Sequence, residues 1–224
     1  MPDSEISLRD LLFEERGLGQ FLATIVERTP AVYGNAHSRS FAERAYDKPE
    51  AVYTFGHNRR GGMEAMFRRE AKSAGLLADT EYTERTNTPY VLVRAGRFLL
   101  TESHVRGRGE IPPTADFRKQ HSAVNALLLK GTLPFPEFDS LKLYELSKAT
   151  GIYGIVSHGS PLDDAKTPGF IRLVFPSENC EKLVENICLF EFRKEFLARQ
   201  KAIAETEIAV DRAQPTLKKK SEDK

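Results

Sequence analysis

The chain has 224 residues, and 33 Lys and Arg residues against 32 Asp and Glu residues give it a formal net charge of +1. A chain of this length buries enough apolar surface to fold without a metal or a disulfide. It has two cysteines, Cys180 and Cys188, no basic leader segment, and no apolar run near the ~20 residues of a membrane span. We therefore expect a soluble, cytoplasmic protein with free thiols, no membrane partner and no cofactor.

Positive charge is concentrated in the middle of the sequence. Residues 51–130 carry 13 Lys and Arg against 8 Asp and Glu, whereas residues 1–50 carry 6 against 9. A local basic region attracts anionic partners even when the total charge is close to zero. The distribution therefore favours an anionic partner for the middle third of the chain.

The first 80 residues predict a mostly helical N-terminal portion. Ser7 can cap a helix, and apolar residues then recur at helical spacing. Residues 34–37 are expected to form a loop and residues 51–55 a short strand. A further helix is predicted to follow the glycines at 61–62 and to end near Gly75.

Two β-hairpins are predicted, at about residues 90–104 and 152–175. In the first, Ala95 and Gly96 form the turn, so that Arg94 pairs with Arg97. Apolar residues occupy both faces of both hairpins. This pattern favours one sheet that contains both hairpins and is covered on both sides.

The remaining segments predict helices. One extends from about Ala115 to Lys130, a short one from residue 139 to 149, and a long one from about Glu178 to Ala213. The long helix is apolar around much of its circumference, so the sheet or a second subunit must cover it. A homodimer through this helix is one hypothesis. The residues expected to be buried there are Leu183, Val184, Ile187, Phe190 and Leu197.

Together these elements predict an α+β fold. Its core, residues 81–213, is an antiparallel sheet built from the two hairpins and packed with helices, including the long C-terminal helix. Residues 1–80 form the helical N-terminal portion, and residues 214–224 are a charged, disordered tail.

Glu102 and His104 are the first candidates for chemistry. They stand two residues apart and share one face of the expected strand, which suits acid–base catalysis or metal ligation. No further residue at a fixed spacing completes a triad or a ligand set, so a polar sheet end is the simpler interpretation. His121 lies on the apolar stripe of its helix, where a core histidine with one hydrogen bond is expected.

His158, Asp163 and Asp164 form a second candidate cluster in the connection between the strands of the second hairpin. A histidine and two carboxylates on a loop held by a rigid hairpin can bind a metal or act as acid and base. The same loop is also rich in Gly, Ser and Pro, which is the ordinary composition of a solvated turn. Both interpretations stay open.

Residues 56–62 read Gly-His-Asn-Arg-Arg-Gly-Gly and resemble an anion cradle at a helix N-terminus. They match neither the P-loop nor the dinucleotide-binding fingerprint. Other basic residues follow in the same third of the chain. The predicted anion-binding or nucleic-acid-binding set is Arg59, Arg60, Arg68, Arg69, Lys72, Arg106 and Arg108.

The spread of these cations over several segments favours a non-enzymatic binding or regulatory protein whose partner is nucleic acid or another phosphate-rich molecule. One alternative is a metal-assisted or acid–base hydrolase that uses Glu102 and His104, or His158 with Asp163 and Asp164. Another is a protein–protein adaptor that uses the C-terminal helix. No metal ligand set is predicted.

Overall fold

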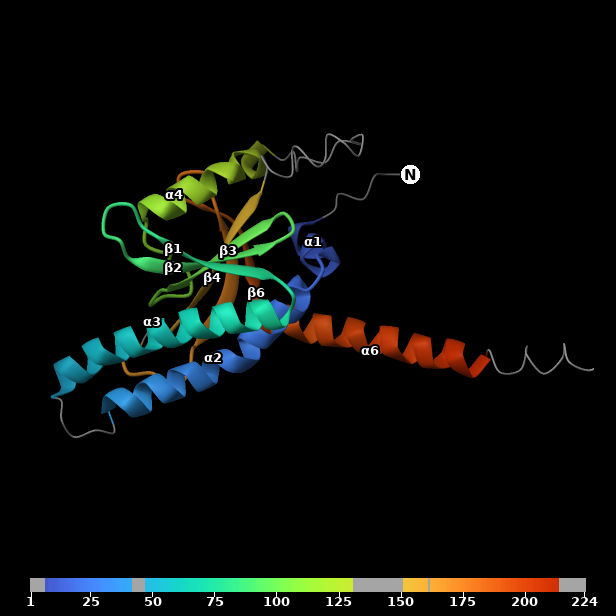
Figure 1. The fold of residues 1–224 in the computed structure, drawn as a ribbon, viewed down its shortest axis with the longest axis horizontal. Helices are drawn as coiled ribbons and strands as arrows, with labels where there is room; N and C mark the ends of the chain where they lie inside the picture. Colours follow the sequence, from blue (N-terminus) through green and yellow to red (C-terminus); the bar gives the residue numbers. More distant parts are fainter. Residues whose placement is uncertain (1–6, 42–46, 131–150, 161, 214–224) are drawn as a thin grey trace, which may run out of the picture.

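The computed structural model of the chain describes residues 7–41, 47–130, 151–160 and 162–213. It is an α+β structure in which a mostly antiparallel sheet is covered by helices on both faces, as Figure 1 shows. The predicted fold class is therefore confirmed. The predicted helix at 139–149 lies outside the described residues.

Six described strands form the sheet in chain order: β1 (Leu77–Tyr82), β2 (Pro89–Ala95), β3 (Phe98–His104), β4 (Ile152–Gly159), β5 (Phe170–Pro176) and β6 (Leu183–Cys188). All neighbouring strands are antiparallel except β3 and β4, which are parallel. The β3–β4 pairing joins the two predicted hairpins, so they belong to one sheet as expected. It also sets His104 opposite His158.

Three N-terminal helices cover one face of the sheet: α1 (Leu8–Glu14), α2 (Leu18–Phe41) and α3 (Lys48–Ser73). Helices α2 and α3 pack side by side, and α3 contacts β1, β2 and β3 (Figure 1). One hydrophobic cluster contains Phe21 of α2, Phe67 of α3, Val93 of β2 and Phe175 of β5. The N-terminal helices and the sheet therefore share a core.

Helix α4 (Asp116–Ser122) and the 3₁₀ helix η1 (Ala123–Lys130) lie on the opposite face of the sheet (Figure 1). Buried Asn125 fastens η1 to the sheet. Its amide nitrogen donates to the carbonyl oxygens of Tyr153 (2.9 Å) and Pro176 (2.7 Å), and its amide oxygen accepts from the Tyr153 amide (2.8 Å). Each polar group of this buried side chain is satisfied.

Two local predictions for the N-terminal portion are wrong. Residues 34–37 are helical within α2, and residues 51–55 are helical within α3. Tyr33 of α2 and Phe55 of α3 pack together in a buried cluster, so tertiary packing holds helices whose glycines suggested breaks. Residues 56–62 are therefore the middle of a helix and not its N-terminus.

The C-terminal helix begins later than predicted. Helix α6 (Leu189–Ala213) starts after β6, and Cys180 occupies a turn with φ of +61°. The helix buries Leu189, Phe192 and Phe196, whereas Phe190 is 38% exposed and Leu197 is 46% exposed. Leu183, Val184 and Ile187 belong to β6, and of these Ile187 is buried. The homodimer through this helix stays a prediction.

Two smaller corrections concern the turn of the first hairpin and the helix that follows that hairpin. Ala95 pairs with Phe98, so the first hairpin turns at Gly96 and Arg97, and Gly96 takes a φ of +51° that favours glycine. The predicted helix from Ala115 to Lys130 changes from α to 3₁₀ geometry after Ser122. The hairpin turn still has two residues and lies one residue later, so Val93 still shares a sheet face with Phe98 and Leu100.

Candidate functional site

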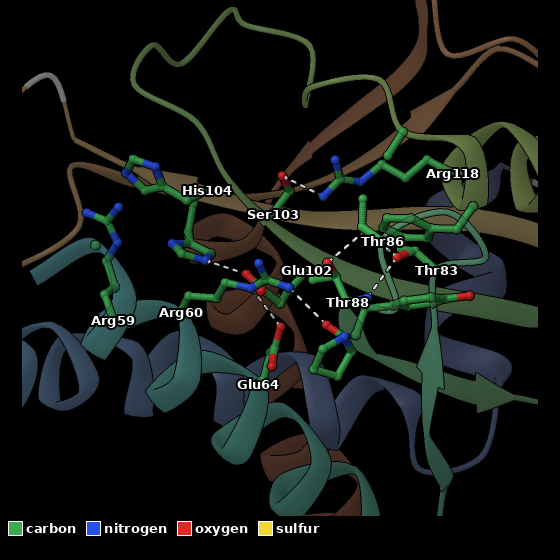
Figure 2. A pocket seen from close by; sticks show the side chains of 16 residues that line it. Arg59, Arg60, Glu64, Thr83, Thr86, Thr88, Glu102, Ser103, His104 and Arg118 are labelled. Carbon is green, nitrogen blue, oxygen red and sulfur yellow. Dashed lines mark hydrogen bonds and ion pairs between the residues drawn. The ribbon is translucent and has the colours of Figure 1, made fainter. Parts of the chain in front are cut away.

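A cleft of about 410 Å³ opens between α3, the ends of β3 and β4, the β1–β2 connection and the start of α4 (Figure 2). Its lining is rich in groups that donate or accept hydrogen bonds. The polar and aromatic lining residues are Arg59, Arg60, Glu64, Thr83, Thr86, Thr88, Tyr90, Glu102, Ser103, His104, Phe117, Arg118 and His158.

The two candidate residues on β3 both reach this cleft. Side chains two residues apart on a strand lie on the same face of the sheet. Leu100 is in the core beneath the N-terminal helices, so Glu102 and His104 lie on that face too. Parallel pairing with β4 then brings His158 beside His104, with 5.8 Å between the ring centroids. The predicted strand face of Glu102 and His104 is confirmed.

A buried chain of hydrogen bonds orients the carboxylate of Glu102. The Tyr33 hydroxyl lies 2.8 Å from Nδ1 of His158, and Nε2 of His158 lies 2.9 Å from Oε2 of Glu102. Because a carboxylate only accepts, Nε2 carries the proton and Nδ1 accepts from the phenol. Burial raises the pKa of Tyr33 well above its usual value, which keeps the phenol protonated as a donor.

Glu102 is therefore oriented by groups that solvent does not reach. Tyr33 and His158 are both 0% exposed, while the Glu102 side chain is 11% exposed and faces the cleft. The second carboxylate oxygen of Glu102, Oε1, has no hydrogen-bond partner within the described part of the chain. That oxygen is free to accept a proton or a hydrogen bond from a bound molecule.

His104 is a neutral imidazole at physiological pH. Burial, followed by the positive charge of Arg59 and by His158 and Arg106, lowers its pKa to about 3. The ring therefore adds no charge to the cleft and offers one donor and one acceptor nitrogen. In Figure 2 it projects on the same side of the cleft as Arg59.

Arg59 is the cation of the cleft that lacks a polar partner. Its guanidinium lies 5.4 Å from the ring centre of Tyr33 and 4.9 Å from that of Phe55, and the residue is 9% exposed. Burial lowers its pKa, but an arginine stays charged at any physiological pH. Within the described residues it forms no hydrogen bond and no ion pair, and the negative charges of Glu102 and Asp163 are near enough to act on it.

The other two arginines of the cleft are occupied. Arg60 is paired with Glu64 (3.0 Å) and donates to the carbonyl oxygen of Pro89 (2.9 Å). Arg118 donates to the Ser103 hydroxyl (3.1 Å) and to the carbonyl oxygen of Pro113, and its buried Nε has no partner. Both contribute positive potential, and Arg59 is the arginine of the cleft lining whose guanidinium has no hydrogen bond or ion pair among the described residues.

The structure divides the predicted basic set. Arg59 and Arg60 line the cleft, and Arg106 lines a neighbouring cavity, where it is paired with Asp163 (3.2 Å). Arg69 is paired with Glu70 and lines another cavity, together with Arg28 and Arg39. Neither the cleft nor the neighbouring cavity is lined by the remaining members, Arg68, Lys72 and Arg108.

The predicted His158 loop cluster does not form. His158 belongs to β4 and is buried, whereas Asp163 and Asp164 are exposed in the β4–β5 connection. Both ring nitrogens of His158 are used within the protein, so neither is free to bind a metal in this arrangement. Among the described residues, no group of three or more His, Cys, Asp or Glu side chains could hold a metal ion.

His121 lies outside the cleft lining. Its Nε2 is 3.2 Å from the Tyr90 hydroxyl and 3.7 Å from Glu81, and burial lowers its pKa. This agrees with a packed histidine that makes a local hydrogen bond. Tyr33, by contrast, is a member of the site that sequence patterns missed, because a tyrosine on an apolar helix face resembles an ordinary core residue.

Comparisons with known proteins add no relative: no family model matches the chain, and neither a curated protein nor a solved structure matches it. Over the ranges that the structure describes, none of the helices has the length and apolar character needed to cross a membrane.

Proposed function

We propose that the protein binds an organic phosphate in the cleft, with Arg59 as the principal cation that holds the phosphate group. The observation that carries this proposal is Arg59, a residue that is 9% exposed and lines the cleft without an ion pair or hydrogen bond among the described residues. A cation that has lost part of its hydration and has no ion-pair partner in the protein is stabilised by a bound anion. A planar guanidinium also suits the geometry of phosphate oxygens.

The rest of the cleft supports a ligand with an organic part. Tyr90 and Phe117 are stacked with 4.0 Å between ring centres, which offers an aromatic surface at one wall. Thr83, Thr86 and Thr88 add hydroxyl groups at the same end. A volume of about 410 Å³ falls within the range of small-molecule sites. A nucleotide-sized phosphate ester fits this description.

A compact site also accounts better for the basic residues than an extended nucleic-acid surface does. Arg60, Arg69 and Arg106 are each paired with a carboxylate, so much of their charge is already compensated. Within the predicted set, Arg59 is the residue that is mostly buried, lines the cleft and has no ion pair with a carboxylate among the described residues. A cytoplasmic location is part of the proposal, because Cys180 and Cys188 are free thiols.

Isothermal titration with adenosine monophosphate tests the proposal. We expect Arg59→Met, which keeps the apolar volume and removes the charge, to weaken binding at least about tenfold, because a hydrogen bond to a charged group contributes about 1.5–3 kcal/mol. Arg69→Gln, on the same helix but with its side chain 66% exposed, is the matched control and should bind as the unaltered protein does. Equal affinity of Arg59→Met and the unaltered protein would refute the role of Arg59.

A second candidate function is hydrolysis of the bound ester by acid–base catalysis. The observation that favours it is the Tyr33–His158–Glu102 hydrogen-bond chain, which orients a carboxylate toward the cleft. In this reaction Glu102 accepts a proton from water as the water oxygen bonds to phosphorus. The ester P–O bond breaks, and the leaving alcohol oxygen takes up a proton from solvent.

Phosphate release from adenosine monophosphate separates the two functions. We expect Glu102→Gln to lose release at least about 100-fold, the usual contribution of a general base, while it still binds the ester. Absence of release by the unaltered protein would leave the binding function and remove the hydrolase.

A further inference from the structure

A second cavity lies directly beyond Arg59. This side cavity has a volume of about 340 Å³, and three residues, Gly56, Arg59 and His104, line both it and the cleft. Arg59 and His104 therefore stand at the boundary of two adjoining spaces. A phosphate group held by Arg59 lies where both spaces meet.

From this arrangement we infer that the natural ligand is a phosphodiester whose two organic groups occupy the cleft and the side cavity. The inference rests on the proposed function and names its ligand class. A monoester has one organic group and fills the cleft alone. A diester places one group on each side of its phosphorus, which matches two cavities that share the cation.

Gly56 keeps the boundary open on the α3 side. A Cβ atom built at this glycine meets no atom within 4 Å, so the space beside it is unfilled. Gly56 also sits within a helix, where alanine would be the more stable residue. A ligand that extends from one cavity into the other needs open space at the wall that they share, and Gly56 leaves that space open.

The walls of the side cavity suit an uncharged organic group. Four apolar side chains contribute to its lining beside the charged Arg106, Glu110 and Asp163, namely Val52, Phe55, Ile111 and Leu162. Its own cation, Arg106, is 3.2 Å from Asp163 and so is already compensated. The side cavity therefore offers packing surface, while Arg59 supplies the charge for the phosphate.

Charge balance also favours a diester. A phosphodiester carries one negative charge, whereas a monoester with a second pKa near 6 carries nearly two at neutral pH. Arg59 is the single cation at the boundary and has no ion pair among the described residues, and the negative charges of Glu102 and Asp163 are close enough to act on it. A singly charged phosphate matches one free guanidinium better than a doubly charged one does.

The test compares the affinities of the dinucleoside monophosphate adenylyl-adenosine and of adenosine monophosphate by isothermal titration. For the unaltered protein we expect the diester to bind at least tenfold more tightly. Gly56→Leu, which fills the passage with a helix-forming side chain, should bring the ratio of the two affinities close to one. Gly61→Leu, an open glycine on the same helix that lines neither cavity, should leave the ratio unchanged.

A ratio near one for the unaltered protein, or a ratio that survives Gly56→Leu, would overturn the diester inference. Binding of the monoester that depends on Arg59, without a preference for the diester, would overturn it while the proposed phosphate site stands. No binding of either compound would overturn both. Thermal unfolding of each variant shows whether it is folded before its ratio is used.

Discussion

At the scale of single residues, the Tyr33 hydroxyl supports the site from inside the core. Tyr33→Phe removes the donor to Nδ1 of His158 and leaves that nitrogen as a buried acceptor without a partner. We expect the free energy of unfolding to fall by about 1–3 kcal/mol, the cost of leaving such a group unsatisfied. Denaturant unfolding measures the loss. Tyr53→Phe, on a residue that is 70% exposed, is the control and should change stability by less than about 0.5 kcal/mol.

His104 makes stability depend on pH. Its pKa in the folded protein is about 3, below the ~6.5 of an unfolded chain. Between these values the unfolded state binds a proton that the folded state does not, so stability falls as the pH falls from 6.5 toward 3. The charged or titratable groups around it that lower this pKa are Arg59, His158 and Arg106.

His104→Gln removes this titration. We expect proton uptake on unfolding, in the window from pH 6.5 down to 3, to decrease by up to about one proton, so that stability falls less steeply with acid. Urea unfolding at a series of pH values gives the slope. An unaltered slope would mean that His104 has the same pKa in the folded and the unfolded protein. His121→Gln is the comparison, because burial lowers the pKa of His121 in the same direction at a different place.

At the scale of elements, alanine substitutions at two adjacent glycines of α3 should have opposite effects on stability. A Cβ at Gly61 meets nothing within 4 Å, whereas a Cβ at Gly62 lies 2.8 Å from Cγ1 of Val32 on α2. Gly61→Ala should stabilise the protein by about 0.5–1 kcal/mol, because alanine is the better helix former. Gly62→Ala should destabilise it by about 1–3 kcal/mol through overpacking between α2 and α3. Chemical unfolding of the pair checks both signs, and equal effects would contradict this helix contact.

The same helices explain where sequence patterns were sufficient and where they were not. Continuous apolar runs located the hairpins, because the sheet buries both of its faces. Alternation also placed Glu102 and His104 on one side of β3. The continuity of α3 through Gly56, Gly61 and Gly62 was not predictable from local preference, because contacts with α2 and the sheet hold it together. Strand β6 was mistaken for helix because its short apolar run directly precedes α6.

At the scale of the whole molecule, the site depends on contacts between distant parts of the chain. The parallel β3–β4 pairing brings His104 beside His158, and α2 then supplies Tyr33 from 125 residues away in sequence. No periodicity encodes such a contact. The sequence could therefore nominate Arg59, Glu102, His104 and His158 one by one, while their convergence required the assembled sheet and helices.

The central claim, that Arg59 holds the phosphate of a bound ester, is tested most directly by NMR of arginine side chains. The Nε–Hε signal of Arg59 in ¹⁵N-labelled protein is assigned by its loss in Arg59→Met and followed during titration with adenosine monophosphate. We predict that this signal shifts and saturates together with the binding measured by calorimetry, while the signal of exposed Arg69 stays in place. A signal from Arg59 that stays unchanged as the ligand saturates the protein would contradict the proposed role of Arg59.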